Sequence, residues 1–258
     1  MALLEVNNVN RSFGGLQALK EVTFCVNQGQ IKGVIGPNGA GKTTLFNIIS
    51  GMLKADSGTV FFSGTAIAGR SPCQIGRLGI SRTFQNLSLF NGMTVLENVM
   101  VGRHCRTHRG IVAAALRTPG QRAEEQRIRQ DAQRCLEVVG MTGKAEMPIA
   151  ALSFGQRRAV ELARALATDP RLLMLDEPAS GLNTKETQDL GALIGRIRDR
   201  GVTILLVEHD MSLIMEISDD LLVLYHGQPI AEGPPAAVRA NPEVIAIYLG
   251  GEVQRAAG

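Results

Sequence analysis

The sequence has no apolar run long enough to cross a membrane. Its longest candidates, residues 111–116 and 204–207, have the length of buried core segments and fall far short of the ~20 residues that a spanning helix needs. Residues 1–6 include an acidic side chain and no basic one, so we expect no secretory signal there. Any task that this protein performs at a membrane is therefore expected to depend on partners.

Closely spaced cysteines and a strong net charge are also missing. The four cysteines, Cys25, Cys73, Cys105 and Cys135, lie far apart and show no C-x-x-C spacing. This distribution argues against a zinc site or a disulfide framework and is typical of the reducing cytoplasm, with buried or incidental thiols as the simplest interpretation. The net charge is only +3, so the charge of the whole molecule does not require nucleic acid or an anionic membrane as a partner.

The composition is that of a globular protein with a real core. Of the 258 residues, 45% are hydrophobic and 20% are charged, which suits one sizeable domain or a core with a smaller lobe. Apolar and polar positions alternate over the first thirty residues, a pattern that predicts short strands joined by turns.

Strands and helices then alternate along most of the chain. The predicted elements are a strand over 31–35, a loop over 36–41, a helix over 43–51, a helix up to 168, a strand over 172–175, a helix over 185–198 and a strand over 202–207. Helices between continuous apolar strands imply βαβ units and a mostly parallel sheet. The sequence therefore predicts an α/β fold.

Residues 94–139 differ from the rest because their periodicity is helical and their charge is basic. Between Arg103 and Arg134 the acidic residues are Glu124, Glu125 and Asp131. The basic residues are Arg103, Arg106, Arg109, Arg117, Arg122, Arg127, Arg129 and Arg134.

The strongest chemical signal is a glycine-rich loop between the strand at 31–35 and the helix that follows it. Residues 36–43 read Gly-Pro-Asn-Gly-Ala-Gly-Lys-Thr, a full G-x-x-x-x-G-K-[ST] phosphate loop. Its glycines let backbone N–H groups surround phosphates, with the helix dipole behind them. Lys42 is expected to reach the β- and γ-phosphates of ATP, and the Thr43 hydroxyl to bind Mg²⁺. The expected ATP contacts of this loop are Gly36, Asn38, Gly39, Ala40, Gly41, Lys42, Thr43 and Thr44.

Two acidic residues end the apolar strand at 172–175. Asp176 lies at the carboxyl end of this strand, where ligands bind in open α/β sheets, and suits a Mg²⁺ site. Its neighbour Glu177 suits the base that polarises an attacking water. A polar strand exit is the structural alternative, and the phosphate loop in the same chain favours the functional interpretation.

A third motif, residues 152–156 (Leu-Ser-Phe-Gly-Gln), leads into a predicted helix over 157–168. Ser153 and Gln156 have the S-x-x-Q spacing of a capping box, which is a purely structural role. A helix start is also an anion site where its backbone donors stay open.

Taken together, these three motifs resemble the ATP-binding-cassette (ABC) ATPases, with residues 152–156 matching the family's LSGGQ signature. Phe154 replaces the first glycine of that signature, and Ala159 stands where a basic residue is frequent. The resemblance implies a P-loop NTPase (RecA-like) core with a mostly parallel sheet, an N-terminal antiparallel β subdomain and a helical subdomain. It implies one domain over residues 1–258, in which 1–86 and 153–258 form the nucleotide-binding core with the β subdomain and 87–152 form the helical subdomain.

The resemblance also implies a site shared by two subunits. Ser153, Gly155 and Gln156 would bind the γ-phosphate of ATP held by a second subunit, identical or paralogous, in a head-to-tail dimer. Asn183, in the dimer-facing segment 180–183, would approach the same ATP, although Asn183 with Glu186 also has the spacing of a helix cap.

Three further residues match family positions. Gln85 matches the glutamine that senses Mg²⁺ and the γ-phosphate, with a plain exposed glutamine as the alternative. His209 matches the switch histidine that orients the catalytic water beside Glu177. Phe13 falls where the family places an aromatic side chain on adenine, with core packing as the alternative. No role is assigned to His104, His108 or His226.

Free-standing single cassettes are typical of importers. Residues 91–99 resemble the importer stretch that follows the family's glutamine. The long basic insert and residues 10–19, 180–183, 207–211 and 248–250 resemble the ATPases of branched-chain (hydrophobic) amino-acid uptake systems. The expected partners are two transmembrane permease subunits and, indirectly, an extracytoplasmic solute-binding protein, at the cytoplasmic face of the bacterial inner membrane. ATPases of urea or short-amide importers are the near alternative.

The basic lobe, residues 87 to about 152, is expected to dock on cytoplasmic permease loops. A solvated basic face or contact with anionic lipid head groups is the alternative. A soluble ABC ATPase that acts on nucleic acid is the competing class, but no aromatic residues are interleaved with the basic ones for base stacking. We therefore expect no nucleic-acid partner.

Overall fold

The computed structural model describes residues 1–83, 89–103 and 119–248. Its first part is an antiparallel sheet with the strand order β2-β1-β4-β5. The two long strands β1 (Ala2–Phe13) and β2 (Leu16–Asn27) form a hairpin whose pairing runs from Ala2↔Asn27 to Phe13↔Leu16. Gly14 and Gly15 make the two-residue turn with φ of 53° and 92°, which glycine adopts without strain. The predicted antiparallel subdomain is confirmed, with two twelve-residue strands in place of several short ones.

The shorter strands complete this sheet on the other side of β1. They are β4 (Ser57–Phe62) and β5 (Thr65–Ala66). The buried residues of β1 are Leu3, Leu4, Val6 and Val9, and the pairing with β2 shifts register between Val6 and Val9.

A six-stranded sheet in the order β10-β9-β3-β8-β7-β6 forms the centre of the molecule. Its strands are β3 (Ile31–Ile35), β6 (Ile80–Arg82), β7 (Leu172–Asp176), β8 (Thr203–Val207), β9 (Asp220–Tyr225) and β10 (Gln228–Gly233). All neighbours pair in parallel except β9 and β10. These pairings confirm the predicted mostly parallel sheet, and every residue of β3, β7 and β8 is buried.

Strands β3, β8 and β7 are neighbours in this sheet, so their carboxyl ends meet at one edge. That edge carries the three predicted groups: the phosphate loop after β3, the acidic pair at the end of β7 and His209 after β8. The strand register places the ends of the three strands side by side, because Val207 pairs with Val34 on one side and with Asp176 on the other.

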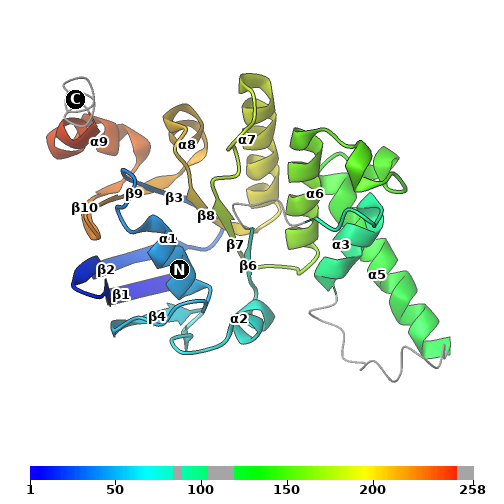
Figure 1. The fold of residues 1–258 in the computed structure, drawn as a ribbon, viewed down its shortest axis with the longest axis horizontal. Coiled ribbons are helices and arrows are strands. Elements are labelled where there is room, and N and C mark those ends of the chain that lie inside the picture. The colour runs from blue at the N-terminus through cyan, green and yellow to red at the C-terminus, as the bar shows by residue number, and fades with distance from the viewer. Residues whose placement is uncertain (84–88, 104–118, 249–258) are drawn as a thin grey trace.

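Helix α1 (Lys42–Ile49) lies between the two sheets (Figure 1). Its buried face, which includes Leu45, Phe46 and Ile49, belongs to one hydrophobic cluster with residues of both sheets. This packing fixes the direction in which α1 points at the phosphate loop. The remaining helices around the sheets are α2 (Pro72–Leu78), α7 (Thr184–Asp199), α8 (Met211–Ile217) and α9 (Pro235–Ala240).

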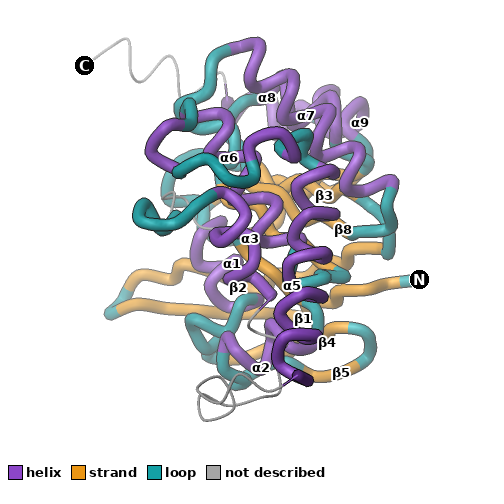
Figure 2. Tube along the Cα trace, turned by 90° about the vertical axis from the view of Figure 1, so that its right-hand side faces the viewer, coloured by secondary structure: helices purple, strands orange, loops and turns teal. Residues whose placement is uncertain are grey.

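A helical lobe lies at one end of the molecule, beyond α7 (Figures 1 and 2). It contains α3 (Val95–Arg103), α5 (Pro119–Val138), two short 3₁₀ helices, η2 (Thr142–Lys144) and η3 (Ile149–Ala151), and α6 (Phe154–Leu166). The predicted helical character of 94–139 is thus confirmed at both ends of that range. The division at residues 87 and 152 stays a prediction, since the core of the lobe is continuous with that of the parallel sheet.

The buried side chain of Asn98 organises the entry into this lobe. Its carbonyl oxygen accepts from the N–H of Phe90 at 2.8 Å, and its amide donates to the carbonyls of Phe90 and Thr94 at 3.1 and 2.9 Å. A buried amide with these bonds fixes the loop that precedes α3. Within the described parts of the chain, no helix has the length and apolar character to cross a bilayer.

Candidate nucleotide site

The phosphate loop (residues 36–43) fits so closely against its neighbours that two glycines have no room for a side chain. A Cβ at Gly36, whose φ is +149°, would overlap the carbonyl oxygen of Leu224 on β9. A Cβ at Gly41, whose φ is +101°, would lie 2.6 Å from the carbonyl oxygen of Ala18 on β2. Only glycine combines this φ with this close approach. The loop is therefore held between both sheets.

Helix α1 begins at the end of this loop without a side-chain cap from the described residues. Gly41 is the N-cap residue and makes no side-chain hydrogen bond. The first N–H groups of a helix have no acceptor inside the helix, so those of residues 42–44 remain available to an anion. The predicted phosphate cradle thus has its donors in place.

Lys42 lies buried beside the loop, with only 6% of its surface exposed. Its ammonium group donates to the carbonyls of Gly36 and Pro37 at 2.6 and 3.0 Å. Burial lowers the pKa of Lys42, and the nearby carboxylates of Glu177 and Asp176 oppose that shift. The side chain therefore lies close to both predicted acidic residues.

Asp176 ends β7 and is buried against an arginine. The Arg82 guanidinium, at the end of the neighbouring strand β6, forms an ion pair with the Asp176 carboxylate at 2.8 Å. Arg82 also donates to the side chains of Asn47 and Ser50 at 2.7 and 3.0 Å. These bonds fix the orientation of the Asp176 carboxylate at the edge of the sheet.

Glu177 and His209 are in direct contact. The Nε2 atom of His209 lies 2.7 Å from Oε1 of Glu177. Glu177 has a left-handed backbone with φ of 49°, and its N–H donates to the carbonyl of Val207 at 2.9 Å. A side chain with this backbone costs of order 1–3 kcal/mol, and such strain persists where surrounding contacts hold it. The two predicted catalytic side chains therefore form one unit.

A cavity of about 510 Å³ brings most of the predicted ATP contacts together. The loop residues Asn38, Gly39, Ala40, Gly41, Lys42, Thr43 and Thr44 line it, together with Phe13, Leu16, Gln17, Ala18, Glu177, His209 and His226. Phe13 is 46% exposed, so the alternative of core packing is wrong. The Arg11 guanidinium lies over the Phe13 ring at 4.7 Å and holds it at the rim.

His226, for which the sequence suggested no role, lines this same cavity. It occupies the turn between β9 and β10 with φ of 46°. The next residue ties the turn to the phosphate loop, because the N–H of Gly227 donates to the carbonyl of Ala40 at 3.1 Å. Only the His-Gly pair between two strands marks this position in the sequence, and it indicates a turn rather than a site.

Tyr248 is a second residue whose position the motifs did not reveal. It packs against the core cluster of the parallel sheet. Burial raises the pKa of its hydroxyl, while a hydrogen bond from the backbone of Gly36 opposes the shift. The end of the described chain thus reaches the first residue of the phosphate loop.

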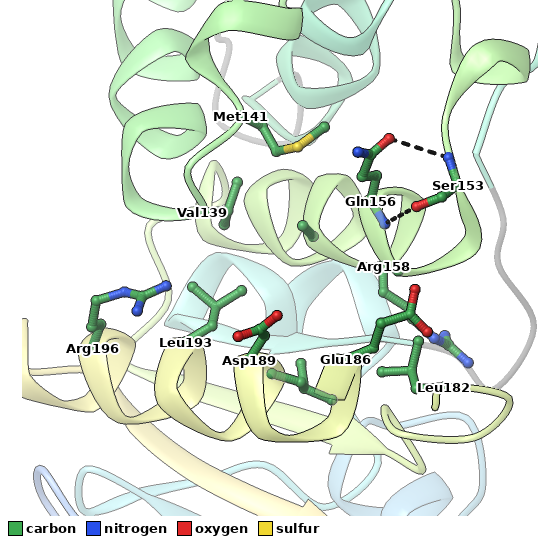
Figure 3. Close-up of a pocket in the computed structure, with 13 residues that line it drawn as sticks. Val139, Met141, Ser153, Gln156, Arg158, Leu182, Glu186, Asp189, Leu193 and Arg196 are labelled. Carbon is green, nitrogen blue, oxygen red and sulfur yellow. Dashed lines mark hydrogen bonds between the residues drawn. The ribbon is translucent and has the colours of Figure 1, made fainter. Parts of the chain in front are cut away.

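The signature segment (residues 152–156) is a capped helix start. The N–H of Gln156 donates to the Ser153 hydroxyl at 3.3 Å, and the N–H of Ser153 donates to the Gln156 side chain at 3.2 Å. Figure 3 shows both bonds among the residues that line a pocket of about 320 Å³. The capping box is confirmed. Among the described residues, this pocket and the phosphate-loop cavity have no lining residue in common.

The signature segment touches the segment at 180–183 within the same chain. A Cβ at Gly181 would lie 3.1 Å from the Phe154 ring, and one at Gly155 would lie 2.8 Å from the Glu186 carboxylate. Asn183 caps α7 in a reciprocal capping box with Glu186, which confirms the helix-cap role. Phe154, the departure from the family signature, therefore serves as a packing contact for Gly181.

Magnesium ions prefer oxygen ligands and commonly keep phosphates and waters among them. Thr43 lines the phosphate-loop cavity, and Asp176 ends β7 beside the lining residue Glu177, so both offer oxygen donors at this edge of the sheet. Across the described residues, no group of three or more histidine, cysteine, aspartate or glutamate side chains gathers to enclose a metal. The donor set thus fits an ion shared with phosphates. Gln85 lies outside the described residues, as do His104, His108 and Cys105.

Comparisons with known proteins cover nearly the whole chain. The family model of ABC transporters matches residues 19–180, and a model of branched-chain amino acid ATP-binding cassette transporters matches residues 228–254. The high-affinity branched-chain amino acid transport ATP-binding protein BraF of Pseudomonas aeruginosa is 45% identical over 249 residues, 96% of this chain and 98% of that protein. The protein LivG of Escherichia coli, described in the same words, is 43% identical over the same shares.

Solved structures give the same picture. The ADP conformation of MJ1267, an ATP-binding cassette of an ABC transporter, is similar with a TM-score of 0.85 and 34% identity. The match covers 97% of this chain and 99% of that one. The likeness therefore extends over both sheets and the helical lobe.

Proposed function

We propose that this chain, which belongs to the ABC transporter family of ATP-binding cassettes, is the ATP-hydrolysing subunit of an importer for branched-chain or other hydrophobic amino acids. Relatives described as branched-chain amino acid transport ATP-binding proteins share 43–45% identity with it over 96% of its length. The observation that carries the catalytic part is the contact of Glu177 with His209 beside a phosphate cradle.

ATP would bind in the cavity of about 510 Å³. The free N–H groups at the start of α1 and the Lys42 ammonium would hold the phosphates. The half-exposed ring of Phe13 would stack on adenine at the rim. Thr43, Asp176 and Gln85 would hold Mg²⁺, which when bound neutralises phosphate charge.

Hydrolysis would use the contact between Glu177 and His209. The Glu177 carboxylate accepts a proton from the attacking water, and His209 orients that water and carboxylate. Because Nε2 of His209 and Oε1 of Glu177 lie 2.7 Å apart, both groups are within reach of one water molecule. A single positioned base of this kind contributes roughly 10²–10⁴-fold to the rate.

The working form would be a head-to-tail dimer. The phosphate-loop cavity and the signature pocket share no lining residue among the described parts of the chain, so one chain presents two separate half-sites. In a closed dimer, Ser153, Gly155 and Gln156 of one subunit would face the ATP of the other, with Asn183 beside them. Closure and reopening would drive the transporter.

The proposed partners are a second ATPase subunit, two permeases and, indirectly, a solute-binding protein, at the cytoplasmic face of a bacterial inner membrane. The basic lobe would dock on permease loops. Ion pairs of Arg103 and Arg134 with Asp131, and of Arg129 with Glu146, fix part of its charge within the lobe. Replacing the exposed Arg127 by glutamate should weaken co-purification with the permeases, whereas Arg239→Glu on α9 should not.

ATP hydrolysis against protein concentration tests the dimer. We expect the rate per chain to rise with concentration and to level off once subunits pair. A rate per chain that is independent of concentration, in the absence of partners, would refute the shared site.

Uptake of labelled leucine tests the cargo. Cells that depend on this subunit should take up leucine with the native chain and not with Glu177→Gln. Uptake of urea or acetamide instead would favour the alternative importer class. Tight binding of RNA or DNA that weakens between two salt concentrations would favour the nucleic-acid class.

A further inference from the structure

Glu208 is a buried acidic residue at the edge of the sheet to which the chemistry above gives no task. It directly follows β8 and precedes His209, and only 4% of its surface is exposed. Its Oε1 atom accepts from the N–H of Ala179 at 2.6 Å. Its Oε2 atom accepts from the N–H of His209 at 2.9 Å, with the N–H of Asp210 at 3.4 Å. One carboxylate therefore joins the backbone of two loops.

Burial of this carboxylate is costly, which argues that its bonds matter. An ionised side chain in the interior must be compensated by hydrogen bonds or opposite charge. Burial raises the pKa of Glu208, the backbone N–H groups oppose that shift, and the charge of Glu177 adds to it. An apolar residue would end a buried strand without this cost, so the position serves the two loops rather than the strand.

The loops joined by Glu208 carry the proposed catalytic pair. Ala179 follows Glu177 by two residues, and His209 follows Glu208 directly. The N–H of Glu177 is already bonded to the carbonyl of Val207 at 2.9 Å. Together with the contact between His209 and Glu177, the Glu208 carboxylate makes the two loops one framework.

The segment 179–181 has a second contact on its other side. The Phe154 ring, at the first position of α6, packs against Gly181, where a Cβ would lie only 3.1 Å from the ring. Glu208 therefore holds this segment from the sheet edge and Phe154 holds it from the signature helix. A continuous set of contacts runs from His209 through Glu208 and residues 179–181 to Phe154.

We propose that Glu208 is a positioning residue that fixes the backbone of His209 to segment 179–181, so that displacement of this segment on subunit closure moves the switch histidine. The proposal rests on the proposed roles of Glu177 and His209 and on the head-to-tail dimer. Segment 180–183 then acts as the sensor of the second subunit, and Glu208 connects it to the catalytic pair.

Glu208→Gln tests the proposal with an isosteric change. Glutamine has one carbonyl oxygen, so its amide N–H₂ must face either the N–H of Ala179 or that of His209. We expect kcat for ATP hydrolysis to fall about tenfold, the rate equivalent of one buried hydrogen bond. The Kd for ATP of the single chain should stay within about twofold. Glu232→Gln, the same change at a glutamate of β10 that pairs with Lys32, should leave both values unchanged.

A double-mutant cycle with Phe154→Leu separates transmission from local stability. If segment 179–181 carries the signal, the effects of Glu208→Gln and Phe154→Leu on kcat should differ from additivity by about threefold or more. Additive effects would overturn the proposal even where each variant alone is slow. A kcat of Glu208→Gln within about twofold of the native value would overturn it as well.

Two further variants distinguish the failure of this proposal from failure of the proposed function. Glu177→Gln and His209→Ala should both lose turnover while they bind ATP. Native turnover in these two variants would refute the catalytic pair and the positioning role with it. Loss of turnover in both, with a native rate in Glu208→Gln, would refute the positioning role alone.

Discussion

The phosphate loop and the signature segment both lead into a helix, but they use their backbone donors differently. Helix α1 starts at Gly41 without a side-chain cap among the described residues, and the Lys42 ammonium lies beside it. Helix α6 starts at Ser153 with a complete capping box that occupies the N–H groups of Ser153 and Gln156. The first start thus leaves its backbone donors open to an anion, whereas the second already uses two of its donors within the chain.

The difference also appears in what surrounds each start. The phosphate-loop cavity contains the contacting pair of Glu177 and His209. The signature pocket is lined instead by side chains of α6 and α7, with Val139 and Met141 on the lobe side (Figure 3). In the proposed function, ATP binding and hydrolysis belong to the first region, and the second region completes the site of another subunit.

Glu177→Gln is the sharpest test of this division. The amide keeps the size of the side chain but cannot accept a proton, so we expect kcat to fall roughly 10²–10⁴-fold. ATP affinity should be kept, because the phosphate cradle is unchanged. Single-turnover hydrolysis and equilibrium ATP binding measure the two effects. Normal turnover would remove Glu177 from the mechanism.

Ser153→Arg should also lower hydrolysis without loss of ATP binding, but from the signature segment. The bulky cation would obstruct apposition of a second subunit, and loss of one phosphate contact of this kind costs about 10²-fold in rate. ATP binding to the single chain should not change, since Ser153 does not line the phosphate-loop cavity. Thr142→Arg, at an exposed site of the same lobe, is the matched control. Unaltered concentration-dependent hydrolysis in Ser153→Arg would contradict the assignment.

Gly36→Ala tests how tightly the phosphate loop is held. Its Cβ would overlap the carbonyl of Leu224, so we expect a loss of about 2 kcal/mol in the free energy of unfolding. Gly39 also has positive φ, but a Cβ there would meet no atom within 4 Å, so Gly39→Ala should cost only about 1 kcal/mol. Urea unfolding of both variants measures the difference. Equal losses would show that space at Gly36 is not limiting.

The smallest expected effect is a difference in the rate of cysteine alkylation between the helical lobe and the part of the chain that contains the two sheets. Burial raises the pKa of Cys135 on α5 to about 11 from an ordinary value of 9.0, so little of the reactive thiolate forms at pH 8. Cys25 on β2 and Cys73 on α2 are exposed. Site-resolved mass spectrometry should show Cys135 reacting at least about tenfold more slowly. Rapid labelling of Cys135 would indicate that the lobe opens.

The sequence predicted those features that depend on local pattern. The phosphate loop, the buried strands β3, β7 and β8 and the capping boxes at Ser153 and Asn183 are each encoded within a few residues. Their positions in the sheet follow from the rule that strand ends carry the site. The structure confirms these elements with shifts of one to three residues at their ends, where helix boundaries are least defined.

Contacts between distant segments could not be predicted in this way. The bond between Arg82 and Asp176 joins residues 94 positions apart, and that between Ala179 and Glu208 joins residues 29 apart. His226 lines the cavity from a turn whose next residue, Gly227, is bonded to Ala40 and Lys20. None of these pairings has a periodic or spaced signal, since strand order in the folded sheet decides them.

The ion pair of Arg82 and Asp176 bears on how the chain matures. Because the guanidinium already balances the carboxylate inside the protein, a newly synthesised chain completes this part of its fold without waiting for a divalent ion. A chelator should then halt turnover and leave the melting temperature in place. In the proposed function, the divalent ion would then bind and leave together with each nucleotide.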